Sequence, residues 1–387
     1  MMQHASFILT VVVSLTATIT RGDHRVANFS NDATYSTVQL IGINGFQSEV
    51  HTVTTRDGYI LSVFRIVSPG GRVTGPPVVL FHDFELSPAH YLIAGPTGNS
   101  IPIELAKQGY DVWLPSDRGS PESSAHVRYN AESDTDYWDY SLDDLSLTDT
   151  PAVIEYIRQV TGSATVGAIG HGQGATRLLM LLADRTICPF NEVLKPVIIL
   201  SPILYYRLSL TPALQIPINS PWLIPYLKNI GGPLFRSRQD RDEFLDPVFR
   251  GLDTDQSMVS SYLSLPSSRA SSNVAAQIIE NGFIDFTFHY DYGVSKNLQV
   301  YGSPIPPLYL LQAISNPYVS FIISLTDEVL SPLDFTRVAL EFALGFRRLY
   351  DLSIIADPFS HIDFAWGMSN NRNVISPILQ LVQKLYW

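Results

Sequence analysis

A glycine-rich turn is the first place in the sequence where chemistry can be expected. The apolar run at residues 165–169 leads into Gly170-His171-Gly172-Gln173-Gly174, and a helical pattern follows. Small residues on both sides of such a turn let a strand and a helix approach closely, and a serine at its centre is exposed as a nucleophile. The centre here is Gly172, and the spacing fits neither a dinucleotide-binding glycine motif nor a phosphate loop with its lysine. The turn therefore has the form of a nucleophile site with an empty nucleophile position.

The elements that must position this turn alternate between short apolar runs and longer helical patterns. Strands are expected at residues 78–81, 112–114, 165–169, 197–200, 319–323 and 352–355. Each run is continuous in apolar residues, as is typical of strands buried on both faces of a parallel sheet. Helices are expected at residues 101–108, 142–160, 175–183, 333–344 and 374–385, and a leading hairpin at residues 52–67. This alternation predicts a doubly wound α/β domain.

The alternation stops between about Leu204 and Val300. That stretch is rich in Pro, Ser and aromatic residues, with helical patterns and no convincing strand. We interpret residues 204–300 as a cap inserted between two strands of the sheet, with ordinary helical core as the open alternative. The expected organisation is then residues 1–20 signal peptide, 42–203 first part of the core, 204–300 cap and 301–387 second part of the core.

A series of short segments follows the order of a known family. The segments are Thr55 to Leu61 (TRDGYIL), Gly109 to Leu114 (GYDVWL), Arg118-Gly119, Tyr137-Trp138 followed by Ser141, the turn at residues 170–174, Asp327, and Ser360 to Phe364 (SHIDF). In this order they resemble the acid lipase family of α/β-hydrolases, from roughly Gly42 to the C-terminus. The resemblance implies an α/β-hydrolase fold: a mostly parallel central sheet with helices on both faces and an inserted helical cap.

The resemblance also implies a chemistry and its residues. Members cleave carboxylic esters, mostly of neutral lipids, with a Ser, an Asp and a His in that chain order. The Ser attacks the acyl carbon, the His takes and returns the proton, and the Asp orients and stabilises the imidazolium. By their places in the motifs, Asp327 and His361 correspond to the acid and the base, and Phe84 and Gln173 to the residues whose backbone N–H groups bind the oxyanion. Neither a cofactor nor a metal ion is implied, and the expected partner is a neutral lipid or a fatty acyl ligand.

Two departures from the family pattern concern the reaction itself. Gly172 replaces the nucleophile, and His82-Asp83-Phe84 replaces the family's His-Gly in the oxyanion loop. Asp83 brings a Cβ and a negative charge to the place where negative charge must develop. Loss of one oxyanion donor costs on the order of 10² to 10³ in rate, and loss of a serine nucleophile about 10⁶. The two departures together predict an impaired or inactive catalyst.

Three functions remain open at this stage. The first is a non-catalytic lipase homologue that binds lipid or acyl chains. The second is a weakly active lipase or esterase, in which His361 activates a water molecule in the space of the missing Ser hydroxyl. The third is a storage protein, such as a yolk component.

Composition and charge exclude several classes of protein. The 387 residues are 45% hydrophobic and 16% charged, which is enough for a large core and excludes a disordered or fibrous chain. The net charge of −11 argues against a nucleic-acid backbone as partner. A single cysteine, Cys188, excludes an intramolecular disulfide and any multi-cysteine metal site. Nothing in the sequence indicates the oligomeric state.

The N-terminus has the pattern of a secretory signal. The apolar run from Phe7 to Leu15 is too short to cross a membrane, and small and polar residues follow it up to Thr20. Asn28-Phe29-Ser30 is an N-glycosylation sequon just after the expected cleavage site near Thr20. We therefore expect a secreted, extracellular glycoprotein with no integral membrane segment in the mature chain.

Overall fold

The computed structural model describes residues 35–68, 75–93, 100–184, 190–266, 268–345 and 349–386. The expected signal peptide, the sequon at Asn28 and Cys188 lie outside the described residues, so these three expectations stay predictions.

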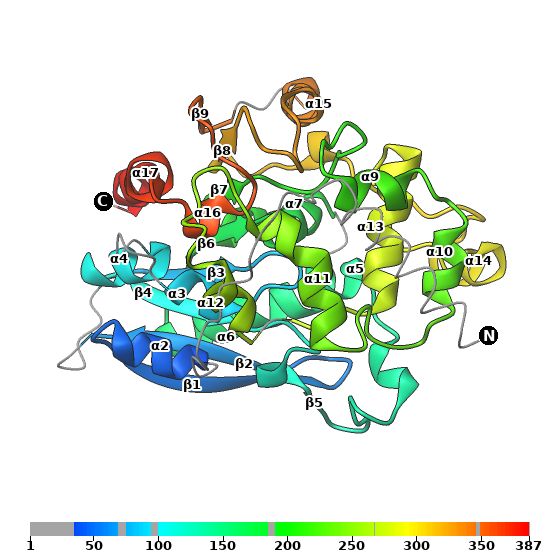
Figure 1. The fold of residues 1–387 in the computed structure, drawn as a ribbon, viewed down its shortest axis with the longest axis horizontal. Coiled ribbons are helices and arrows are strands. Elements are labelled where there is room, and N and C mark those ends of the chain that lie inside the picture. Colours follow the sequence, from blue (N-terminus) through cyan, green and yellow to red (C-terminus); the bar gives the residue numbers. More distant parts are fainter. Residues whose placement is uncertain are drawn as a thin grey trace.

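One mixed sheet forms the centre of the molecule (Figure 1). Its order is β1-β2-β4-β3-β6-β7-β8-β9, and the short β5 pairs with β2. The bounds are β1 Gln47–Thr54, β2 Tyr59–Val67, β3 Pro77–Phe81, β4 Asp111–Pro115, β5 Ala125–His126, β6 Val166–His171, β7 Leu194–Leu200, β8 Val319–Ser324 and β9 Asp351–Ile355. The hairpin β1–β2 is antiparallel, β2 is antiparallel to β4, and every neighbouring pair from β4 to β9 is parallel. This is the α/β-hydrolase fold, as expected.

Helices cover both faces of the sheet, which explains the continuous apolar runs of β3, β4, β6, β7 and β8. The expected burial on both faces is wrong for β9, which lies at the edge of the sheet and is largely exposed. On one face, Val79, Phe81 and Phe321 join a core with the helices α6 (Thr150–Thr161), α7 (Gln173–Ala183) and α15 (Pro332–Leu344). On the other face, Val78, Leu80 and Ile322 pack with α2 (Thr37–Ile43), α4 (Ile101–Lys107) and α17 (Ser376–Tyr386). All six predicted strands and the predicted hairpin are confirmed, with ends that differ by a few residues.

Two of the predicted helices are irregular where the pattern suggested continuity. The stretch expected as one helix at residues 142–160 contains α5 (Leu142–Asp144), a π-helical turn (Leu145–Asp149) and then α6. The C-terminal helix likewise begins with a π-helical turn, Asn371–Ile375. Further short helices are α3 Pro88–Leu92, α8 Phe190–Val193 and α16 Asp363–Trp366, with 3-10 turns at Pro121–Ser123, Thr135–Trp138 and Leu311–Ala313.

The chain between β7 and β8 is helical, and its described residues contain no strand of the sheet. Its helices are α9 Pro212–Ile218, α10 Leu223–Lys228, α11 Arg238–Phe249, α12 Val259–Ser264, α13 Ser272–Ile284 and α14 Val294–Tyr301. In Figure 1, α9, α10, α13 and α14 gather at one end of the molecule, opposite the C-terminus. Leu223, Ala276 and Ile279 belong to a separate small core, whereas Tyr206 and Val274 join the core of the sheet. The segment is thus packed both on itself and on the sheet.

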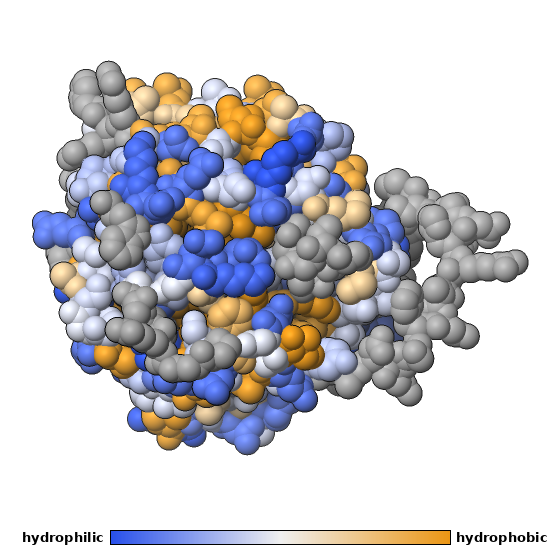
Figure 2. Space-filling model, turned by 90° about the vertical axis from the view of Figure 1, so that its left-hand side faces the viewer, coloured by the Kyte–Doolittle hydropathy of each residue, from blue (hydrophilic) through white to orange (hydrophobic). Residues whose placement is uncertain are grey.

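The surface mixes hydrophobic and hydrophilic residues. On the side shown in Figure 2, orange and blue residues are interspersed. Among the described residues, no helix has both the length and the apolar character needed to cross a membrane.

Candidate active site

The turn at Gly172 joins β6 to α7 in a conformation that favours glycine. Gly172 has φ +53° and ψ −113°, a backbone region that is costly for residues with a side chain. The flanking glycines are needed for close approach. A Cβ on Gly174 would lie 2.6 Å from the carbonyl carbon of Phe81, and one on Gly170 would lie 2.6 Å from the amide nitrogen of Ala175. The sharp strand–turn–helix predicted from the sequence is present.

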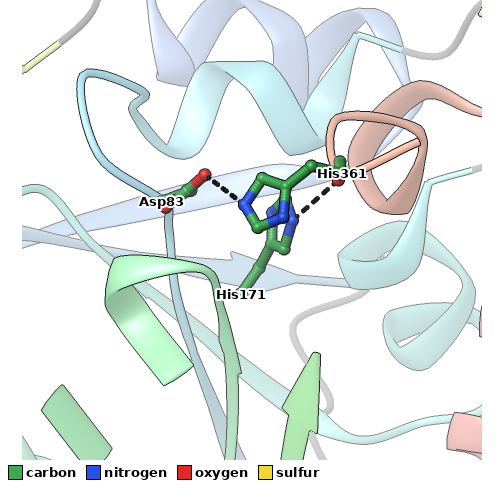
Figure 3. Close-up of side chains that lie close together, drawn as sticks. All are labelled: Asp83, His171 and His361. Atoms are coloured by element: carbon green, nitrogen blue, oxygen red, sulfur yellow. Dashed lines mark hydrogen bonds and ion pairs between the residues drawn. The ribbon is translucent and has the colours of Figure 1, made fainter. Parts of the chain in front are cut away.

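The carboxylate of Asp83 fills the space that a nucleophile would occupy. A Cβ on Gly172 would lie 2.6 Å from Oδ2 of Asp83 and nearer still to Oδ1 and Cγ. Asp83 follows β3, and its Oδ1 accepts the backbone N–H of Gln173 at 2.6 Å. Its Oδ2 accepts Nε2–H of His361 at 3.1 Å (Figure 3). The nucleophile position, expected to be empty, is therefore filled by a neighbouring side chain, and the water molecule expected beside His361 has no room there.

The structure brings His361 and Asp327 together as the motifs predicted. Nδ1 of His361 lies 3.1 Å from Oδ2 of Asp327, which follows the end of β8. The other carboxylate oxygen of Asp327 accepts the N–H groups of Val329 and Leu330 at 2.8 and 2.9 Å. Asp327 is thereby fixed in orientation, and it fixes the imidazole of His361 in turn. His361 consequently stands between two carboxylates, one on each ring nitrogen.

Ser201 is a further member of the site that the sequence reasoning missed. It directly follows β7 with φ +43°, and its hydroxyl donates to Asp327. The same hydroxyl oxygen lies 3.0 Å from Nδ1 of His361. The available signal was its place immediately after a buried parallel strand, the sheet edge at which such sites form.

Electrostatics favour the ionised form of the Asp83–His361 pair. Burial alone would raise the pKa of Asp83, but the hydrogen bond and charge of His361 outweigh it and lower that pKa to about 2. Burial alone would lower the pKa of His361, but Asp327 and Asp83 raise it well above 6.5. Both side chains are almost completely buried. The site therefore holds an imidazolium between two carboxylates, not a neutral base.

His171 lies under His361 and stays neutral. The two rings are 4.8 Å apart between centroids with 31° between their planes. Burial lowers the pKa of His171 to about 4. Its Nε2 lies 3.0 Å from the carbonyl oxygen of His361 (Figure 3). Its Nδ1 lies 3.0 Å from the Tyr91 hydroxyl. In the neutral form Nε2–H donates to that carbonyl, and Nδ1 accepts from Tyr91.

Asp83, His171 and His361 are also the set that comes nearest to a metal-binding group among the described residues. One ligand atom from each lies within 4.8 Å of the others. The ring nitrogens of both histidines already have hydrogen-bond partners. Binding of an ion would require the Asp83–His361 pair to separate. The arrangement fits an ion pair better than a metal centre.

The expected oxyanion donors have different surroundings. The N–H of Gln173 is occupied by Asp83. Phe84 is half-buried between the sheet core and the small core of the helical segment, and its N–H makes no hydrogen bond to the described part of the chain. One of the two donors is thus already bound to an internal anion.

Several residues of the ordered motifs contact one another between the β1–β2 hairpin and the loop after β4. Arg118 is fully buried, and its guanidinium pairs with Asp57 from the turn of the hairpin and with Asp149. It lies 3.6 Å over the ring centroid of Tyr59. The hydroxyl of Tyr137 accepts the N–H of Gly119 at 3.1 Å. These residues hold the hairpin against the loop after β4.

Comparisons with known proteins find similarity to lipases, as the ordered motifs and the fold predict. Residues 37–95 match the family described as a partial alpha/beta-hydrolase lipase region. Gastric triacylglycerol lipase of Mus musculus is 27% identical over 381 residues, covering 91% of this chain and 92% of its own. Lipase 1 of Drosophila melanogaster is 27% identical, with 92% and 82% covered. Triacylglycerol lipase 1 of Arabidopsis thaliana is 28% identical, with 88% of both chains covered.

The chain is similar to these lipases over most of its length. The matches support the acid lipase family that the ordered motifs indicated. Solved structures support the fold alone: an esterase from Thermogutta terrifontis has a TM-score of 0.53 at 12% identity, covering 88% of this chain and all of its own. An esterase from Pyrococcus furiosus has a TM-score of 0.52 at 13% identity, covering 95% of this chain and all of its own.

Proposed function

We propose that this lipase homologue no longer cleaves esters and instead binds acyl lipids as a secreted protein. The observation that carries the first part is the position of Asp83. Its carboxylate lies where the nucleophile and the oxyanion of an acyl-transfer reaction would lie, on the N–H of Gln173 and on Nε2 of His361.

Each step of ester cleavage meets an obstacle in this arrangement. Attack on the acyl carbon needs a hydroxyl at Gly172, which has no side chain. Proton transfer needs an unprotonated Nε2 on His361, but that atom donates to Asp83, and the neighbouring carboxylates raise the pKa of His361. The tetrahedral intermediate needs its negative charge stabilised, and Asp83 places a negative charge beside it. Asp83 causes two of these obstacles and Gly172 the third, so a change at either position alone leaves at least one obstacle in place.

The retained architecture supports a binding role. The helical segment at residues 204–300 stands where we expect a cap, and it contributes a small apolar core of its own. Phe84 of the turn after β3 packs against that core as well as against the sheet core. The relatives are named as lipases, whose substrates are acyl lipids. We propose that the segment covers an acyl-binding space as the cap.

Secretion rests on the apolar run from Phe7 to Leu15 and on the sequon at Asn28. Expression in cells with a secretory pathway tests it. The mature protein in the medium should begin near residue 20 and should lose apparent mass on treatment with an N-glycosidase. Retention inside the cells with an intact Met1 would contradict it.

Two assays on the purified protein test the proposed function. With a short-chain chromogenic ester, wild type and His361→Ala should show the same background rate, because no catalytic proton transfer depends on His361. After incubation with mixed lipids and gel filtration, extraction and mass spectrometry should recover acyl lipids with the protein. A rate that falls in His361→Ala would contradict the loss of activity, and absence of retained lipid would contradict the binding role.

A further inference from the structure

A pocket lined by both charged and apolar residues lies between the turn after β3 and the helical segment. It has a volume of about 310 Å³, and four arginines line it: Arg236, Arg238, Arg241 and Arg269. Asp83, His171 and His361 do not line it, so it is separate from the candidate active site. Four guanidinium groups on one small pocket are a strong local concentration of positive charge in a chain whose net charge is −11.

The acidic partners of these arginines neutralise only part of that charge. Arg238 and Arg241 both pair with Asp242. Arg269 pairs with Glu132, which is largely exposed to solvent. Within the described part of the chain, no hydrogen bond or ion pair involves Arg236. Arg236 therefore brings a positive charge to the pocket that no carboxylate of the described residues pairs with, and the helix α11, whose N-cap Ser237 also lines the pocket, adds the positive end of its dipole.

Glu85 is the one acidic side chain that lines the pocket, and it is held in a form suited to donating a hydrogen bond. It is 2% exposed and has φ +57°, and its Oε1 accepts the N–H of Ala270 at 2.9 Å. Burial raises the pKa of Glu85 to about 8, an effect that the charges of Arg241 and Arg269 offset only in part. At neutral pH a protonated Glu85 can donate to an anion instead of repelling it.

The remaining wall is apolar. Phe235, Leu265, Pro266 and Pro121 line the pocket beside the charged groups. A small inorganic anion would leave this surface uncovered, whereas a hydrocarbon chain would bury it. The volume is near the lower end of the usual range for small-molecule sites, roughly 300–1,000 Å³, which suits a chain of medium length.

We propose that this pocket binds the carboxylate end of a medium-chain fatty acid, with the arginines and Glu85 on the carboxylate and the apolar wall on the chain. The inference rests on the proposed function, because it specifies one acyl ligand and the residues that recognise it. The charge of the ligand distinguishes this proposal from simple binding of an apolar chain. A neutral ester of the same chain offers the same apolar contact without the anion.

Isothermal titration calorimetry of the full-length protein tests the proposal with three probes: decanoate, methyl decanoate and inorganic phosphate. Decanoate should bind at least tenfold more tightly than methyl decanoate, and phosphate should bind more weakly than decanoate. Arg236→Gln should weaken decanoate about tenfold through loss of a charge-assisted hydrogen bond. Arg250→Gln is the matched control, since Arg250 lies at the other end of α11 and pairs with Asp246. This control should bind decanoate as wild type does.

Each other result overturns the inference. Equal binding of decanoate and methyl decanoate, unchanged in Arg236→Gln, would show acyl binding elsewhere and leave the proposed function intact. Phosphate binding as tight as that of decanoate would make the pocket a general anion site. Failure of decanoate to bind would remove the pocket as a fatty acid site, and the lipid extraction described above would decide separately whether the protein binds acyl lipids at all.

Discussion

Asp83 and Gly172 fit the structure only as a pair. The carboxylate of Asp83 occupies the volume beside the α-carbon of Gly172, so a side chain at position 172 would collide with it. The same carboxylate satisfies an N–H of the turn and pairs with His361. In a serine esterase, the nucleophile hydroxyl faces the imidazole. Here the carboxylate of Asp83 faces both the imidazole of His361 and the N–H of Gln173.

This pairing predicts that Gly172→Ser alone is destabilising. The new Cβ must displace Asp83, and the backbone at φ +53° is strained for a non-glycine residue, so we expect a loss of about 2–5 kcal/mol. Gly162→Ser is the control, because Gly162 also has a positive φ, +68°, but a Cβ there meets nothing within 4 Å. It should lose only about 1 kcal/mol. Urea unfolding of both variants gives the comparison, and equal losses would mean that Asp83 does not occupy the space.

The Asp83–His361 ion pair predicts a dependence of stability on pH. The pKa of Asp83 falls from 3.8 to about 2 on folding, so its contribution is full above pH 3.8 and disappears as the pH falls to 2. The pKa of His361 rises above 6.5, so its contribution is full below pH 6.5 and is lost as the pH rises through the folded value. Asp83→Asn should therefore cost most between about pH 4 and 6.5, by about 2 kcal/mol.

Urea unfolding of wild type and Asp83→Asn at a series of pH values measures this difference. The two stabilities should converge towards pH 2 and should approach each other again well above pH 6.5. A difference that stays constant from pH 2 to 9 would contradict the ion pair.

At the scale of elements, the contact of α7 with β3 and β6 depends on glycines. A Cβ on Gly174 would meet the carbonyl groups of both Phe81 and His82 at less than 3 Å, and backbone atoms cannot move aside as a side chain can. Gly174→Ala should therefore cost about 3 kcal/mol or more, although alanine favours helices. Gly232→Ala is a suitable control, because a Cβ there lies 3.8 Å from its nearest neighbour. Thermal unfolding distinguishes the two, and a stable Gly174→Ala variant would contradict the close packing.

The helices and strands could be predicted from the sequence where their hydrophobic patterns depend only on neighbouring residues. Apolar runs identified the six parallel strands; five of them are buried as expected, whereas the edge strand β9 is largely exposed, with Leu352 and Ile354 open to solvent. The π-helical turn at Leu145–Asp149 was missed, since an insertion of that kind leaves the apolar periodicity almost unchanged. Ser201 was missed because its role depends on where the ends of β7 and β8 meet in space.

At the scale of the whole molecule, the ordered motifs predicted which residues converge but not how Asp83 is used. Asp83 was expected to disturb the oxyanion loop, whereas its side chain reaches across to the turn after β6 and fills the nucleophile position. That outcome depends on the distance between two turns from neighbouring strands, which no local pattern encodes. The structure has the α/β-hydrolase fold with a buried Asp327–His361 pair, and the obstacles to ester cleavage that we propose come from two positions, Gly172 and Asp83.

The most direct test of this account is the initial rate of short-chain ester hydrolysis by four proteins: wild type, Gly172→Ser, Asp83→Gly, and the double variant. Asp83→Gly makes room for the serine side chain, frees Nε2 of His361 and frees the N–H of Gln173. We predict that the double variant hydrolyses the ester at least about 10² times faster than each of the other three proteins. Adding His361→Ala to the double variant should abolish this increase. If Gly172→Ser by itself reaches the rate of the double variant, Asp83 does not hold the nucleophile position and the central claim is wrong.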